Sequence, residues 1–126
     1  MTRNVFVIGL GLIGGSVALA LQKAPHTKVF GYDYHEQTRQ LASTLQVVHE
    51  VVEDPAEFAK EADVIIFGTP VNITLDFMDQ LKSWELKKGV IITDTGSTKA
   101  QIMEKALELR ELGITFIGGH PMAGSH

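Results

Sequence analysis

Short runs of apolar residues alternate along the chain with stretches in which apolar residues recur every three or four positions. The runs are rich in β-branched residues and are nearly uninterrupted by polar ones, which is typical of parallel strands covered on both faces. We therefore predict buried parallel strands at these positions. They lie at 4–9, 28–33, 62–68, 89–94 and 114–119, with a weaker candidate at 47–52.

The stretches between these runs predict helices, at 12–22, 35–44, 54–61, 72–84 and 98–112. Two begin with capping signals, Asp54 before Pro55 and Thr98 with Gln101. Three carry an apolar stripe: Ile13, Val17 and Ala20; Leu75, Met78 and Leu81; Ile102, Ala106 and Leu109. The alternation of strand and helix predicts a doubly wound, mostly parallel α/β sheet with helices on both faces. No linker or repeat divides the 126 residues, so we expect one domain over 1–126.

Composition narrows the classes of function. The formal net charge is −4 and no block of lysine or arginine stands out, so we expect neither nucleic acid nor a membrane as a partner. The chain has no cysteine, which excludes disulfides and thiolate catalysis and agrees with an expected cytoplasmic location. His120 and His126 have no third ligand at metal-binding spacing, so we expect no metal site. Glycines interrupt the apolar segment 5–21, which predicts a strand, turn and helix there rather than a signal peptide or membrane span.

A glycine pattern marks the first predicted turn. The letters "GLGLIG" at 9–14 fit G-x-G-x-x-G, between a predicted strand and a predicted helix, as dinucleotide binding requires. Gly9 permits the tight turn, Gly11 leaves room for a pyrophosphate, and Gly14 lets the helix pack closely on the strand. The helix N-terminus adds N–H groups and a partial positive charge. We therefore predict a Rossmann sheet that binds the dinucleotide through Gly9, Leu10, Gly11, Leu12, Ile13 and Gly14.

Asp33 is the second element of this cofactor site. It ends the second predicted strand, 19 residues after Gly14, near the expected spacing of about 20. A carboxylate there accepts the ribose hydroxyls and repels a 2′-phosphate, so NAD is expected over NADP. Arg39 is close enough in sequence to weaken that preference, and a solvated acid at the end of a strand is the alternative for Asp33.

Thr69 and Pro70 follow the fourth strand, at the edge where such sheets bind ligands. We expect them to border the cofactor, although a plain turn with Pro70 starting a helix explains the same letters.

The chain also carries candidates for proton transfer. A nicotinamide enzyme that oxidises an alcohol needs a base for the hydroxyl proton, and His120 directly follows a predicted strand. A loop histidine bonded to a backbone carbonyl is the alternative. Ser97 could donate to a substrate or to the nicotinamide end, or it could simply cap the following helix. Lys99 is better explained as a surface lysine in the first helical turn.

Three segments together carry a family resemblance: "VFVIGLGLIGGSVALAL" (5–21), "DTGSTK" (94–99) and "GGHPMAGSH" (118–126). They resemble the prephenate/arogenate dehydrogenase family of tyrosine biosynthesis, over essentially the whole chain. The resemblance implies NAD-dependent oxidative decarboxylation of prephenate to 4-hydroxyphenylpyruvate. In that reaction His120 would accept the proton of the ring hydroxyl, and Ser97 would hydrogen-bond that hydroxyl or orient His120. His126 stands where many relatives carry an acid, and we assign it no role.

The resemblance also implies a second, C-terminal helical domain that dimerises and completes the substrate site, and that domain is absent from this chain. The chain alone is therefore expected to bind cofactor with little or no turnover, and the longer protein to form a homodimer. Two other readings stay open. A β-hydroxyacid dehydrogenase would share the glycine turn but not "HPMAG", and a nucleotide-sensing module would need no base beside the nicotinamide.

Overall fold

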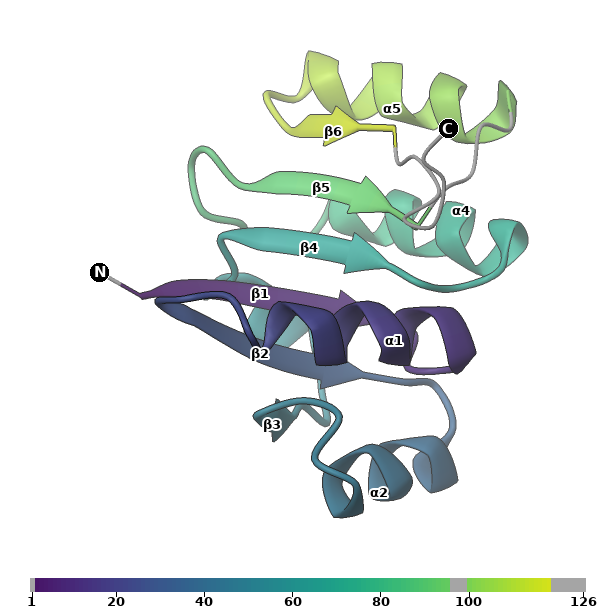
Figure 1. The fold of residues 1–126 in the computed structure, drawn as a ribbon. Helices are drawn as coiled ribbons and strands as arrows, with labels where there is room; N and C mark the ends of the chain where they lie inside the picture. The colour runs from purple at the N-terminus through teal and green to yellow at the C-terminus, as the bar shows by residue number, and fades with distance from the viewer. Residues whose placement is uncertain (1, 96–99, 119–126) are drawn as a thin grey trace, which may run out of the picture.

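Six parallel strands form one sheet at the centre of the molecule (Figure 1). The computed structural model describes residues 2–95 and 100–118. The spatial order of the strands is β3-β2-β1-β4-β5-β6, so the chain builds outward from β1 to β3 and then returns beside β1 to add β4. The strands are β1 (Arg3–Ile8), β2 (Thr27–Tyr32), β3 (Glu50–Val51), β4 (Val64–Phe67), β5 (Ile91–Asp94) and β6 (Thr115–Ile117).

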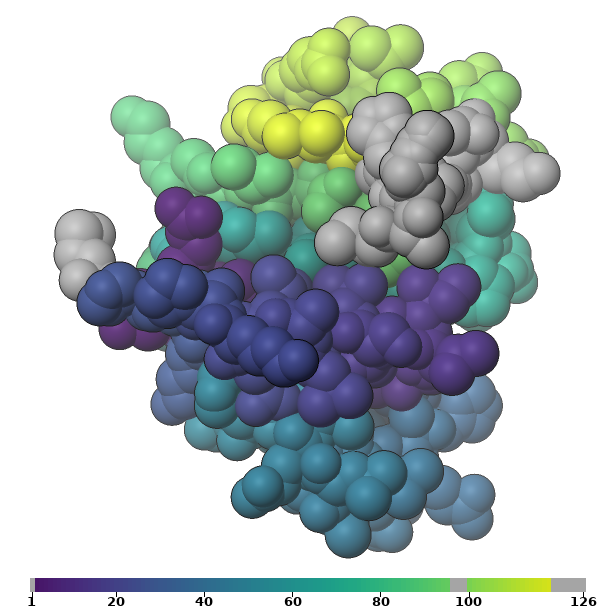
Figure 2. Space-filling model, viewed as in Figure 1, coloured from purple at the N-terminus to yellow at the C-terminus, as the bar shows by residue number. Residues whose placement is uncertain are grey.

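Helices cover both faces of this sheet. They are α1 (Leu12–Leu21), α2 (Glu36–Thr44), α3 (Pro55–Ala59), α4 (Val71–Leu81) and α5 (Ala100–Glu111). The helices α1 and α2 pack on one face through Ala18 and Ala42. The helices α3, α4 and α5 supply the core of the other face. Figure 2 shows α1 lying across the middle of its face.

The central strand explains why the sequence runs are continuously apolar. Val5 and Val7 belong to the core under α1 and α2, whereas Phe6 and Ile8 belong to the core under the other helices. Successive side chains of a strand point to opposite faces, so a strand covered on both faces needs apolar residues at every position.

The predicted elements are confirmed, with two differences. The weak strand candidate at 47–52 is a two-residue strand at the edge of the sheet. The stripe predicted for α1 is wrong: Ile13 is 60% exposed, and Ala20 is exposed too. The buried face of α1 is formed by Gly14, Gly15, Val17 and Ala18. Apolar periodicity misses such a face because glycine contributes no side chain to the pattern.

The helix before β4 begins as predicted. Asp54 caps α3, accepting from the Ala56 and Glu57 N–H groups at 3.1 and 3.4 Å, with Pro55 at the first helical position. The cap predicted at Thr98 lies outside the described residues. Within the described ranges, no helix is long and apolar enough to cross a membrane.

Candidate cofactor site

The candidate site lies where the strand order reverses, between β1 and β4. Gly9 directly follows β1 and Gly68 directly follows β4, so both lie at the carboxyl edge of the sheet. In open α/β sheets, ligands bind at this edge and at this reversal. The two strands bring the glycine turn beside the "GTPV" segment at 68–71.

Three glycines let main-chain segments touch here. Gly9 has φ +100°, a conformation that favours glycine. A Cβ on Gly14 would lie 1.8 Å from the Gly9 carbonyl oxygen, and one on Gly68 would lie 2.8 Å from the Gly14 Cα. The turn after β1, the start of α1 and the turn after β4 therefore pack backbone against backbone. The glycine pattern at 9–14 does not include Gly68, and its place directly after an apolar run is the one sequence signal for it.

Gly11 differs from these three because the space beside it is open. A Cβ at Gly11 would meet no described atom within 4 Å. Leu12 and Ile13, at the start of α1, are 89% and 60% exposed. The helix has no side-chain cap and no acidic residue in its first turn. Its first N–H groups are thus available to an anion, and the room at Gly11 fits a pyrophosphate.

The structure joins Asp33 to the glycine turn. Its Oδ2 accepts a hydrogen bond from the Leu10 N–H at 2.8 Å, and its Oδ1 accepts one from the His35 N–H at 2.9 Å. The Asp33 side chain is 12% exposed. The His35 ring Nδ1 also lies 3.3 Å from Oδ1, whereas Oδ2 has the Leu10 N–H as its one donor among the described residues. A carboxylate oxygen has about two acceptor positions, so Oδ2 keeps capacity for a ribose hydroxyl.

Arg39 is engaged with the main chain beside this acid. Its Nη1 donates to the Asp33 carbonyl at 2.8 Å, and its Nη2 lies 3.4 Å from Glu53 Oε1. Its position in the sequence predicts a cation that weakens the preference for NAD. The structure instead pairs it with carbonyl groups and with Glu53.

Thr69 and Pro70 lie in the turn after β4, as predicted. A Cβ on Gly9 would lie 2.7 Å from Thr69 Cγ2, so Thr69 is a direct neighbour of the glycine turn. The hydroxyls of Thr69 and Thr74 are 2.7 Å apart, and Pro70 accepts from the Thr74 N–H at 2.8 Å. Thr74, which is buried, ties this turn to the first turn of α4. No motif or spacing in the sequence points to Thr74.

Ser97, His120 and His126 lie outside the described residues. The last described residues before Ser97 and His120 are Thr95, just after β5, and Gly118, just after β6. Both positions are at the carboxyl edge of the sheet, as Gly9 is, because all six strands run parallel.

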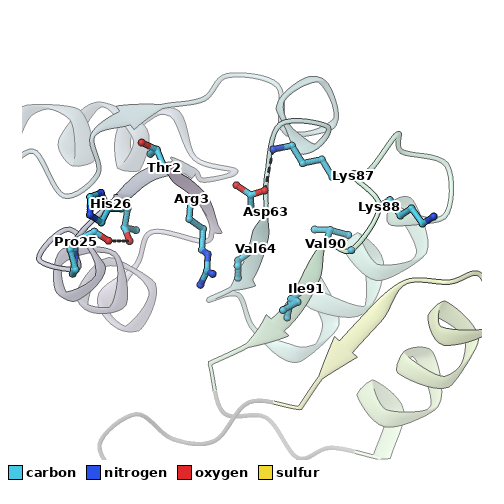
Figure 3. Close-up of a pocket in the computed structure, with 12 residues that line it drawn as sticks. Thr2, Arg3, Pro25, His26, Asp63, Val64, Lys87, Lys88, Val90 and Ile91 are labelled. Carbon is cyan, nitrogen blue, oxygen red and sulfur yellow. Dashed lines mark hydrogen bonds and ion pairs between the residues drawn. The ribbon is translucent and has the colours of Figure 1, made fainter.

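A cavity of about 580 Å³ lies at the opposite, amino edge of the sheet (Figure 3). Asp63 at its wall accepts from the Asn4 N–H at 2.8 Å and from Lys87 Nζ at 3.1 Å. The Asn4 N–H bond and then the Lys87 contact hold the pKa of Asp63 below its ordinary value. These contacts tie the starts of β1 and β4 to the loop before β5. The cavity is separate from the glycine turn.

Comparison with known proteins agrees with this geometry. Residues 17–126 match the nucleotide-binding domain family of prephenate dehydrogenase. The chain is 43% identical, over 126 residues, to prephenate dehydrogenase of Lactococcus lactis subsp. cremoris (strain MG1363), covering 98% of this chain and 35% of that protein. The chain thus spans about a third of the length of this curated relative.

Two solved structures are similar over nearly the whole chain. Synechocystis arogenate dehydrogenase has a TM-score of 0.82 and 33% identity, covering 98% of this chain and 42% of that one. Prephenate dehydrogenase from A. aeolicus, in complex with hydroxyphenyl propionate and NAD⁺, has a TM-score of 0.80 and 28% identity, covering 100% and 44%. With the match over residues 17–126, these similarities show that the chain belongs to the prephenate dehydrogenase nucleotide-binding domain family.

Proposed function

We propose that this chain is the NAD-binding part of a prephenate or arogenate dehydrogenase. The observation that carries the proposal is the hydrogen bond from the Leu10 N–H to the Asp33 carboxylate, because it joins the glycine turn to the acid that follows β2. Family membership and the NAD⁺ bound to the A. aeolicus relative support the same ligand. NAD is preferred to NADP, because Asp33 would repel a 2′-phosphate.

Each residue of the site has a binding task. The first N–H groups of α1, from Leu12 onward, donate to the pyrophosphate, which approaches over Gly11. Asp33 accepts the hydroxyls of the adenosine ribose. Thr69 and Pro70 border the cofactor beyond β4. Bound NAD supplies the hydride acceptor for the reaction.

His120 and Ser97 carry the proton chemistry of the proposal, which rests on the "HPMAG" and "DTGS" segments and on family membership. His120 accepts the proton of the ring hydroxyl as hydride leaves the ring carbon. Ser97 hydrogen-bonds the same hydroxyl or orients His120. Loss of carbon dioxide then makes the ring aromatic, giving 4-hydroxyphenylpyruvate from prephenate. The full-length protein would act as a cytoplasmic homodimer, joined through its C-terminal part.

The test is a turnover assay on the full-length protein with prephenate and with arogenate. In that protein, His120→Asn should leave the NAD dissociation constant unchanged and lower kcat by about 10²–10⁴-fold, the range for removing a general base. The wild-type rate should fall at acid pH, because a protonated imidazole cannot accept the hydroxyl proton. His26→Asn is the matched control, since His26 lies at the amino edge of the sheet.

Three results would contradict the proposal. A His120→Asn variant with normal kcat and the same acid limb would leave His120 as a structural loop residue. Turnover of a β-hydroxyacid but of neither cyclohexadiene substrate would favour the other dehydrogenase class. Nucleotide binding without turnover of any of these substrates would favour a sensing module.

A further inference from the structure

One arginine side chain braces the turn that carries the ribose-binding acid. Arg39 lies on α2, and its side chain is 15% exposed. Its Nη1 donates to the Asp33 carbonyl at 2.8 Å and to the Tyr34 carbonyl at 3.4 Å. Its Nη2 lies 3.4 Å from Glu53 Oε1, and its guanidinium carbon lies 5.6 Å from the centre of the Tyr32 ring. A single planar group thus joins the end of β2, the following turn and the segment after β3.

The braced turn also determines how the Asp33 carboxylate is held. One oxygen accepts from Leu10 in the glycine turn, and the other accepts from the His35 main chain within the braced turn itself. The carboxylate therefore keeps its direction only while the main chain from Asp33 to His35 stays in place. Arg39 donates to the Asp33 and Tyr34 carbonyls of that main chain.

The guanidinium of Arg39 is directed at protein acceptors in this arrangement. Nη1 donates to the Asp33 and Tyr34 carbonyls, Nη2 lies 3.4 Å from Glu53 Oε1, and Nε is buried with no hydrogen-bond partner among the described residues. Within the described chain, Arg39 forms no ion pair with the Asp33 carboxylate, so the negative charge of Asp33 is not paired with its guanidinium.

We propose that Arg39 is a positioning residue for cofactor selection: it fixes the Asp33 carboxylate toward the ribose hydroxyls and so increases the preference for NAD over NADP. The inference rests on the proposed NAD-binding function. It assigns Arg39 the opposite effect to the one its charge suggests, since a guanidinium beside the ribose would ordinarily attract a 2′-phosphate.

The test compares NAD and NADP dissociation constants, measured by calorimetry on the full-length protein. Arg39→Met keeps most of the side-chain volume and removes the donors. We expect it to weaken NAD binding by about tenfold, the scale of a lost charge-assisted hydrogen bond, and NADP binding by less. The ratio of the NADP to the NAD dissociation constant should therefore fall. Arg39→Lys should restore part of that ratio, because one ammonium can still donate to a carbonyl.

A double-mutant cycle shows whether Arg39 acts through Asp33. In an Asp33→Asn background, Arg39→Met should no longer change the ratio, because the charge that it positions is gone. The control is Arg110→Met, in the last turn of α5 and far along the sheet from the glycine turn; it should leave both constants unchanged.

The outcomes separate the possible roles. A ratio that rises in Arg39→Met would make Arg39 a ligand of the 2′-phosphate and overturn the inference. A lower melting temperature with both constants weakened equally would make its role merely structural and also overturn it; if Arg39→Met does not fold, the ratio in Arg39→Lys decides. A wild-type protein that binds neither cofactor would overturn the proposed function itself. A wild-type protein that binds NAD, together with Arg39 variants whose ratio of dissociation constants does not fall, would overturn the inference alone.

Discussion

The two edges of the sheet are built from the same six strands but by different means. At the carboxyl edge, Gly9, Gly14 and Gly68 bring main-chain segments into direct contact, and Asp33 accepts from backbone N–H groups. At the amino edge, main-chain hydrogen bonds such as that from the Arg3 N–H to the His26 carbonyl are supplemented by a side-chain ion pair between Lys87 and Asp63.

Because of this difference, we expect the two edges to tolerate substitutions differently. Backbone contacts at Gly9, Gly14 and Gly68 leave no space for an added methyl group, whereas the amino-edge ion pair has both members partly exposed, at 41% for Lys87 and 35% for Asp63. Exposed ion pairs contribute about 0–1 kcal/mol. Substitutions should therefore destabilise the fold strongly at these three glycines and weakly at the amino-edge pair.

The largest effect is expected at Gly14. In Gly14→Ala the new Cβ would lie 1.8 Å from the Gly9 carbonyl oxygen, so the start of α1 must move away from the turn. We expect the free energy of unfolding to fall by about 3 kcal/mol or more, the upper range for overpacking, measured by urea denaturation.

Gly15→Ala is the matched control for that variant. Its Cβ would meet the Leu10 carbonyl oxygen at 3.4 Å and Val47 Cγ1 at 3.7 Å, both ordinary contacts. The change should stay within about 1 kcal/mol, helped by the higher helix propensity of alanine. An equal loss in the free energy of unfolding in the two variants would mean that the close packing at Gly14 is not what makes this edge sensitive to substitution.

A second change at the carboxyl edge should separate binding from folding. Gly11→Val places its side chain in open space, so the melting temperature should stay near that of the wild type. The same side chain would occupy the path of the pyrophosphate, so NAD binding should be lost in calorimetry. Unchanged NAD affinity would show that this turn does not hold the phosphates.

The smallest effect is expected at the amino edge. The pKa of Asp63 is lowered first by the Asn4 N–H bond and then by Lys87, so this carboxylate stabilises the fold in its charged form. The contribution is complete above the ordinary carboxyl pKa of about 3.8 and is lost as the pH falls through the lower folded-state pKa.

Asp63→Asn should therefore lower the free energy of unfolding at pH 7 by under about 1 kcal/mol, because the site is partly exposed. The difference from wild type should shrink as the pH falls below 4, in denaturation curves recorded across that range. Glu85→Gln, at an exposed loop position, is the control. If Asp63→Asn lowered the free energy of unfolding as much as Gly14→Ala, the expected difference between the two edges would be wrong.

The strands, the helices and the chemistry of the first turn can be predicted from the sequence. Continuous apolar runs located the strands because a doubly covered strand is apolar at every position, as Val7 and Phe6 show. The spacing from Gly14 to Asp33 indicated a dinucleotide site because the motif lies within one local strand–helix–strand unit.

Only the tertiary structure shows which distant residues pack against this strand–helix–strand unit. Gly68 touches Gly14 because β4 lies beside β1, a consequence of strand order that local periodicity does not contain. The Arg39 guanidinium contacts the Asp33 carbonyl and Glu53, which follows β3, and the sequence does not reveal this pairing because the contacts join separate segments. The charge of a side chain is known from the sequence. The direction in which that side chain points depends on contacts between segments that only folding brings together.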